Sequence, residues 1–178
     1  RPELTNSQRK MLSHYDNATL YNDSIVAQIV KRFQKQDAII IYVPDHGEEC
    51  YEENRGFICR NHSAEIDWPL AHYEFEIPFW IYCSSKYIRN HRDIYRQIRK
   101  AKDKRFMTDA LPHLLLYLAG IETPTYKEEY NILSPKYDEM RPRILKNSAD
   151  YDKLRDAYLE KVKKEESKTV KKKKGDKK

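Results

Sequence analysis

The chain has 178 residues, and its 34 Lys and Arg against 28 Asp and Glu give a formal net charge of +6. Residues 161–178 hold ten lysines and three acidic residues, a net charge of +7, which leaves −1 for everything before them. A basic groove through a folded domain, of the kind that binds nucleic acid, is therefore not supported. No apolar run reaches the 18 or so residues that a transmembrane helix needs.

The N-terminal sequence contains neither a signal peptide nor an initiator Met. Arg1-Pro2-Glu3-Leu4 leads into polar sequence without the apolar segment of a secretion signal. We therefore expect a fragment or a processed product, whose localisation signals could lie in a missing part. Cys50 and Cys59 could pair in an oxidising compartment or remain thiols, and the sequence leaves both possibilities open.

The first predicted element is a helix that begins at Asp16-Asn17, whose side chains can accept hydrogen bonds from first-turn N–H groups. Its apolar residues recur at three- and four-residue steps in one stripe, Tyr21, Ile25, Val26, Ile29, Val30 and Phe33. Residues 38–43 then form a short apolar run without alternation, which is typical of a strand buried on both faces of a parallel sheet.

Residues 48–76 are acidic, aromatic and irregular, and we expect a long functional loop there. Residues 78–83 predict a second buried strand, and Ser84-Ser85 a cap for a short helix. Residues 92–102 predict a basic surface helix.

Thr108-Asp109 predicts the cap of a further helix that ends at Gly120. Its buried side is expected to hold Leu111, Leu114, Leu115 and Leu118. Residues 122–148 are expected to be loop, and residues 149–164 a charged helix that leads into the lysine tail. Helices alternating with buried strands indicate an α/β layered fold.

Asp45-His46-Gly47 lies at the carboxyl end of the first predicted strand, where open α/β sheets bind ligands. A carboxylate and an imidazole are suitable ligands for a divalent metal such as zinc. The glycine would let the backbone turn sharply. The alternative is that Asp45 caps a turn and His46 makes a local hydrogen bond, because two adjacent residues are a weak motif.

Two further histidines, His62 and His72, follow in the predicted loop. Each could supply another metal ligand or hold an anionic substrate. The alternative is a surface or packing histidine, which is favoured for His72. The chain has no Gly-rich phosphate loop, CxxC, GxSxG or HExxH motif, and no Ser, Thr or Cys stands out as a nucleophile beside a base.

Three segments in a fixed order resemble the C-terminal part of the membrane-anchored phosphoethanolamine transferases, in the sulfatase and alkaline phosphatase superfamily. They are YDNATLYND at 15–23, IYVPDHGEE at 41–49 and IPFWIYCS at 77–84, and the similarity spans about residues 14–140. The resemblance implies an α/β layered sandwich of the alkaline-phosphatase-like type. Residues 1–148 would be the C-terminal part of that catalytic domain, with only its part of the sheet and helices, and residues 149–178 a charged helix and lysine-rich tail.

The resemblance implies that Asp45 and His46 are zinc ligands. It also implies that a downstream histidine holds the phosphoethanolamine group. His62, sixteen residues before Pro78, is the best match, and His72 is the second candidate. The sequence departs from the family pattern at Ser63, where Gly is common, and at Pro44, where Ser is usual.

The family's threonine nucleophile, an acidic metal ligand and an upstream histidine lie before the matched region, so the resemblance implies that the catalytic nucleophile is not in this chain. The implied reaction transfers phosphoethanolamine from phosphatidylethanolamine to lipid A or a related glycan. The implied partners are these lipids, the missing N-terminal half of the domain and, through the parent protein, the membrane, but not nucleic acid. The parent would face the periplasm from the bacterial inner membrane. The fragment itself would be soluble and inactive, with weak zinc binding.

Two alternatives stay open. A sulfatase or phosphodiesterase-type hydrolase of the same superfamily would share the metal geometry, and its distinguishing nucleophile would lie outside this chain. A non-enzymatic binding module would use residues 161–178 to dock on anionic lipid or nucleic acid. A disordered, solubilising tail is the simpler interpretation of the same residues.

Overall fold

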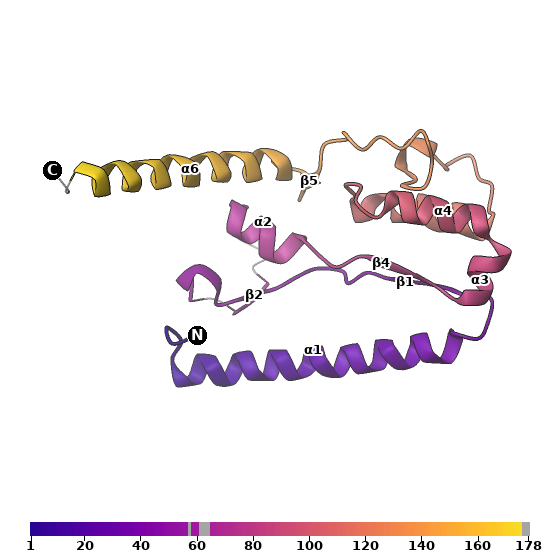
Figure 1. Ribbon diagram of the computed structural model, residues 1–178, viewed down its shortest axis with the longest axis horizontal. Helices are drawn as coiled ribbons and strands as arrows, with labels where there is room; N and C mark the ends of the chain where they lie inside the picture. Colours follow the sequence, from indigo (N-terminus) through magenta and orange to yellow (C-terminus); the bar gives the residue numbers. More distant parts are fainter. Residues whose placement is uncertain (57, 61–64, 176–178) are drawn as a thin grey trace. The chain divides into compact units, whose positions relative to one another are not determined.

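The computed structural model describes residues 1–56, 58–60 and 65–175, and the chain divides into two compact units. The first unit comprises Arg1–Asp45, Cys50–Phe57 and Ile77–Arg141. The second comprises His46–Glu49, Ile58–Glu76 and Pro142–Lys178. Figure 1 shows the order of the helices and strands along the chain.

Helix α1 (Asn6–Phe33) begins ten residues before the predicted start. Its N-cap is Thr5, whose Oγ1 accepts a hydrogen bond from the Gln8 backbone N–H at 3.2 Å. The Gln8 side-chain oxygen accepts from the Thr5 N–H at 2.9 Å in return. This capping box satisfies two N–H groups of the first turn. The predicted cap at Asp16-Asn17 was wrong, and both residues lie inside the helix.

No residue of α1 is fully buried, so the predicted apolar stripe does not face a core as a whole. Val26 and Val30 are half-buried, whereas Tyr21, Ile25 and Ile29 are exposed. In the described part of the chain, α1 therefore covers only part of its apolar stripe.

Strands β1 (Ile39–Tyr42) and β4 (Trp80–Cys83) confirm the two predicted strands. They pair with each other in antiparallel register, with Ile39 opposite Cys83 and Tyr42 opposite Trp80. The rings of Tyr42 and Trp80 stack with centroids 5.1 Å apart. The expected parallel pairing and complete burial were wrong, since all eight residues are only half-buried. An apolar run in the sequence predicts that both faces of a strand are covered, but it does not predict whether the neighbouring strand is parallel or antiparallel.

Helices α3 (Ser85–Asn90) and α4 (Arg92–Ala101) confirm the expected short helix and basic surface helix. The Ser84 Oγ accepts from the Tyr87 N–H at 3.0 Å and donates to the Gln36 carbonyl oxygen at 2.6 Å. Ser84 therefore caps α3 and also ties it to the segment that leads into β1.

Helix α5 (Leu111–Ala119) follows the 3-10 turn η2 (Thr108–Ala110). Asp109 does not cap α5, because its carboxylate forms a bidentate ion pair with Arg141 at 2.7 Å. Leu114 is fully buried, but Leu115 is 46% exposed, which corrects the expectation that both face the core. Gly120 ends the helix in a left-handed conformation, as predicted.

The core of the first unit forms where α4 and α5 pack against the segment around Ile132 and Leu133. Ile94, Ile98 and Ala101 supply the α4 side of this core. Residues 122–143 are irregular apart from the turn η3 (Glu128–Tyr130), as expected, but the end of the predicted loop 122–148 contains a short strand, β5 (Ile144–Leu145). The turn η1 (Glu52–Asn54) also belongs to this unit.

The second unit contains helices α2 (Trp68–Phe75) and α6 (Tyr151–Gly175). Ala71, Leu145 and Tyr151 form its buried core. Helix α2 lies inside the predicted long loop, because Asp67 caps it by accepting from the Leu70 N–H at 2.9 Å. Helix α6 begins near the predicted position and runs further into the lysine tail.

The remaining strands are short, with β2 at Glu49–Cys50, β3 at Ile58–Cys59, β5 at Ile144–Leu145 and β6 at Ala149–Asp150. Strand β5 pairs antiparallel with β6, and this pair leads directly into α6. The three cysteines of the chain are thiols. Within the described ranges, no helix combines the length and apolar character needed to cross a membrane.

Candidate metal and substrate site

The Asp45-His46-Gly47 loop lies three residues beyond the end of β1. Asp45 is exposed and His46 is half-buried. The His46 Nδ1 lies 2.8 Å from the Gly47 carbonyl oxygen. Because a carbonyl oxygen only accepts, this contact assigns the proton of a neutral ring to Nδ1 and the lone pair to Nε2. A backbone carbonyl often orients metal-binding histidines in this way.

Gly47 brings this loop into direct contact with the backbone of α2. Its N–H donates to the Glu74 carbonyl oxygen at 2.9 Å. A Cβ added at this position would lie 2.3 Å from the Tyr73 carbonyl oxygen. Gly47 is not among the residues with positive φ, so the predicted sharp turn is not its role. It is glycine because two backbone segments approach too closely for a side chain.

His72 lies on α2, one residue before the segment that Gly47 contacts. Its ring stacks on Trp68 with centroids 5.5 Å apart, and its Nδ1 lies 3.1 Å from a Glu76 carboxylate oxygen. These contacts match the packing alternative, although 43% of the side chain stays exposed. His62, the other predicted substrate histidine, lies outside the described residues.

Asp45 and His46 offer one oxygen and one nitrogen donor, a combination that suits zinc. Within the part of the chain that the structure describes, no group of three or more His, Cys, Asp or Glu residues is arranged to hold a metal ion. Structural and catalytic zinc sites take three or four protein ligands. The described residues therefore fit part of a zinc site.

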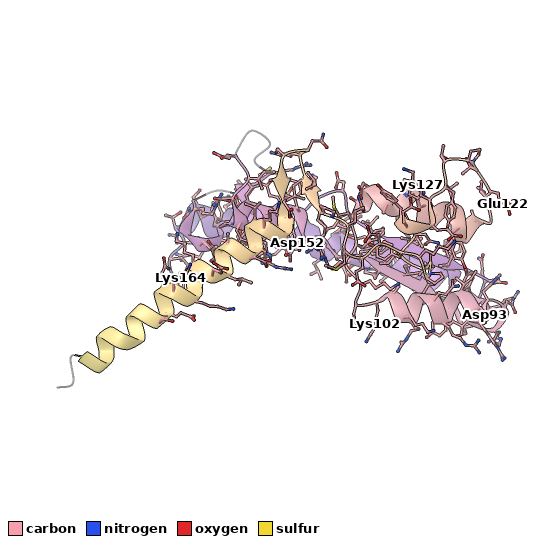
Figure 2. All side chains as sticks on the ribbon, turned by 90° about the horizontal axis from the view of Figure 1, so that it is seen from above. Asp93, Lys102, Glu122, Lys127, Asp152 and Lys164 are labelled. Atoms are coloured by element: carbon pink, nitrogen blue, oxygen red, sulfur yellow. The ribbon has the colours of Figure 1, made fainter. Side chains whose placement is uncertain are left out.

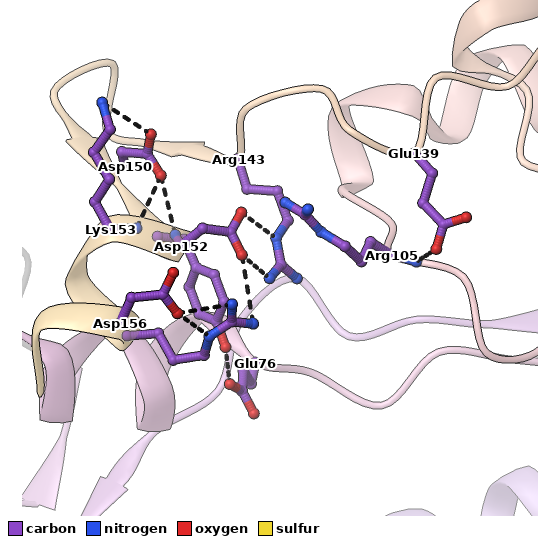
Figure 3. Close-up of polar contacts among 10 residues, drawn as sticks. Glu76, Arg105, Glu139, Arg143, Asp150, Asp152, Lys153 and Asp156 are labelled. Atoms are coloured by element: carbon purple, nitrogen blue, oxygen red, sulfur yellow. Dashed lines mark hydrogen bonds and ion pairs between the residues drawn. The ribbon is translucent and has the colours of Figure 1, made fainter. Parts of the chain in front are cut away.

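A second group of polar residues, which sequence reasoning missed, connects α2 with the start of α6 (Figure 3). The Tyr151 hydroxyl donates to the Glu76 carboxylate. The Arg143 guanidinium lies 4.2 Å from the centre of the Tyr151 ring and donates to both Asp152 oxygens at 2.7 and 3.2 Å. Burial raises the pKa of Tyr151, and the bond to Glu76 raises it further. These pairs involve residues up to 75 positions apart, so no local pattern indicates them.

Two buried carboxylate side chains were also missed. Glu49 and Glu74 are 2% and 1% exposed, and both belong to the second unit. Glu49 lies two residues after Gly47, and the Glu74 backbone carbonyl accepts the hydrogen bond from the Gly47 N–H. In the sequence both appear within an acidic segment that is typical of a solvated loop.

The helices and strands of the chain, with the Asp-His-Gly loop after β1, place it in the α/β class with an alkaline-phosphatase-like fold. Residues 1–121 match the model of the Sulfatase family, and the chain belongs to this family. Phosphoethanolamine transferase EptC of Escherichia coli K12 is 30% identical over 161 residues, which cover 86% of this chain and 26% of the relative. Phosphoethanolamine transferase EptA of Helicobacter pylori is 31% identical over 93 residues, covering 51% of this chain and 17% of the relative.

The C-terminal periplasmic domain of EptC from Escherichia coli has a similar fold, with a TM-score of 0.69 at 29% identity. The alignment covers 86% of this chain and 43% of that domain, and a crystal structure of its complex with Zn gives the same values. These comparisons confirm the predicted family resemblance and α/β fold class. The chain spans about a quarter of the length of its EptC relatives.

Proposed function

We propose that this chain is the C-terminal part of a zinc-dependent phosphoethanolamine transferase. The complete protein would move phosphoethanolamine from phosphatidylethanolamine to lipid A or a related cell-envelope glycan, through a threonine outside this chain. The 30% identity with phosphoethanolamine transferase EptC of Escherichia coli K12, over 86% of this chain, carries the proposal. The names of the relatives support a transferase, including the Kdo(2)-lipid A phosphoethanolamine 7''-transferase of Escherichia coli K12, 28% identical over 100 residues.

The site residues have distinct proposed roles. Asp45 and His46 would hold zinc, which when bound lowers the pKa of a hydroxyl nucleophile and stabilises negative charge on phosphoryl oxygens. Gly47 fixes the loop against α2 and orients the His46 ring through its carbonyl oxygen. His62 and His72 would contact the phosphoethanolamine group, His72 through Nε2, because its Nδ1 faces Glu76.

The remaining partners and the location follow from the same proposal. The rest of the catalytic domain would supply the nucleophile and the other metal ligands. The proposed donor and acceptor lipids would put the complete protein at the periplasmic face of the bacterial inner membrane.

The test uses the complete protein that contains this chain, expressed in a strain without other lipid A transferases. Mass spectrometry of extracted lipid A should show added phosphoethanolamine for the wild type, and none for Asp45→Asn or His46→Gln at equal protein levels. His14→Gln, on the exposed surface of α1, is the matched control and should keep the modification. Full modification by the His46 variant, or hydrolysis of sulfate esters in place of transfer, would contradict the proposal.

A further inference from the structure

Helix α4 separates its apolar and its basic residues onto opposite faces. Ile94, Ile98 and Ala101 pack into the core of the first unit. The other side is exposed and, apart from Asp93, its charged residues are cationic. We call its four cations the α4 cationic face: Arg92, Arg96, Arg99 and Lys100. Figure 2 shows this helix, with Asp93 labelled near its start and Lys102 just beyond its end.

The α4 cationic face has little acidic compensation. Asp93 forms an ion pair with Arg96 at 2.7 Å, and both side chains are largely exposed. Within the described residues, no carboxylate pairs with Arg92, Arg99 or Lys100. Exposed ion pairs of this kind are weak, so even Arg96 is available to another anion.

The preceding helix extends the same charge. Helix α3 adds the exposed cations Lys86 and Arg89, so α3 and α4 together hold six cations and one acidic residue, a net charge of +5. The remainder of residues 1–160 then carries a net charge of −6. Two consecutive helices therefore carry a local net charge of +5 in a body whose total charge is close to zero.

The shape and composition of this face favour an extended anionic surface. A small anion requires donors that converge on one point, whereas these side chains project from the convex side of a single helix. Single-stranded nucleic acid binds where aromatic side chains stack on bases, and none of the outward-facing residues is aromatic. A row of exposed arginine and lysine side chains fits the headgroups of anionic phospholipids.

We propose that the α4 cationic face is a docking surface for an anionic phospholipid bilayer. The inference rests on the proposed function, because an enzyme whose donor and acceptor are both lipids works at a bilayer. Each cation near such a surface strengthens binding by about fivefold at low salt. The contribution falls as the salt concentration rises.

The test measures sedimentation of the full 178-residue chain with vesicles at low salt. Vesicles of phosphatidylcholine with phosphatidylglycerol are compared with vesicles of phosphatidylcholine alone. One variant replaces the four residues of the α4 cationic face with Gln. The matched control replaces Lys171, Lys172, Lys173 and Lys174 with Gln, which removes the same charge from the lysine tail. Binding of the α4 variant to anionic vesicles should weaken by at least about tenfold, and by clearly more than that of the control.

Three results would overturn the proposal. The wild type could fail to bind anionic vesicles, both variants could lose the same affinity, or the α4 variant could lose affinity for duplex DNA as strongly as for vesicles. The four side chains are exposed, so the variant should unfold at the wild-type temperature. If it does not, the pair Arg92→Gln and Arg99→Gln provides the milder test. Vesicle binding needs no catalysis, so its failure is distinguishable from failure of the lipid A assay.

Discussion

Gly47 shows how one residue can hold a loop against a helix. The Gly47 N–H donates a hydrogen bond to the Glu74 carbonyl oxygen of α2, and a Cβ on Gly47 would clash with the Tyr73 carbonyl oxygen. Such contacts tolerate no side chain, because carbonyl oxygens on a helix cannot move without breaking the helix. The residue after His46 is therefore constrained by packing.

We expect Gly47→Ala to lower the free energy of unfolding by about 1–3 kcal/mol, since the added methyl must push the loop away from α2. Urea denaturation of the chain measures this loss, and a change below about 0.5 kcal/mol would contradict the clash. Gly56→Ala is the matched control. An added Cβ at Gly56 would be strained by the φ of +70° but would have no atom within 4 Å. The complete protein should therefore keep lipid A modification with Gly56→Ala and lose it with Gly47→Ala.

Tyr151 makes stability depend on alkaline pH. Burial and the bond to Glu76 raise its pKa in the folded state, whereas the unfolded chain loses the phenol proton near pH 10. Its contribution to stability is therefore complete below about pH 10 and is lost as the pH rises through the folded pKa.

We expect Tyr151→Phe to be less stable at neutral pH by about 1 kcal/mol, the value of one hydrogen bond. Its unfolding free energy should also decline less steeply than that of the wild type above pH 10. Urea titrations across this range measure both effects. Tyr21→Phe, at an exposed position of α1, should reproduce the wild-type curve. Equal slopes for the wild type and Tyr151→Phe would rule out this role for Tyr151.

At the scale of the element, α5 offers two adjacent leucines with opposite environments. Leu114 is fully buried in the core of the first unit, whereas Leu115 is 46% exposed. We expect Leu114→Ala to cost about 2–5 kcal/mol, because it removes buried methyl groups and leaves a cavity. Leu115→Ala should stay within about 0.5 kcal/mol of the wild type. Chemical denaturation of the two variants checks the helix orientation, and similar losses would mean that the orientation is wrong.

The elements that sequence reasoning predicted correctly are those with local signals. The apolar runs of β1 and β4, the Ser84 cap of α3 and the basic pattern of α4 all lie within a few neighbouring residues. The start of α1 was also encoded locally, in Thr5 and Gln8, but the capping box was overlooked. Helix α2 was hidden because its aromatic and acidic residues are typical of a loop, although Asp67 before Trp68-Pro69 is a helix-start signal.

The site was predictable only where residues are adjacent in the sequence. Asp45 and His46 stood out because they are adjacent to each other and lie just beyond the first predicted strand. The contact of Gly47 with α2, the bond between Glu76 and Tyr151, and the antiparallel pairing of β1 with β4 join residues 27 to 75 positions apart. Contacts at this range depend on tertiary packing, for which a single sequence carries no local pattern.

At the scale of the molecule, the chain spans 43% of the solved EptC domain and holds two candidate zinc ligands. We expect weak zinc binding and no transferase activity from these 178 residues alone. Calorimetry should show no saturation at concentrations where a complete structural site, worth about 10–16 kcal/mol, is filled. His46→Gln should give the same isotherm. Tight one-to-one binding by the wild type would show that the chain completes the site by itself.

The separation of α4 into an apolar inner face and a cationic outer face has an evolutionary consequence. Ile94, Ile98 and Ala101 attach α4 to the core of the first unit, whereas the outer residues Arg92 and Arg99 are not part of that core. Substitutions on the outer face therefore cost little stability. Selection can therefore change the charge of this face among related proteins without disturbing the fold. We expect the outer residues to vary with the membrane that each protein meets, and the inner residues to stay constant.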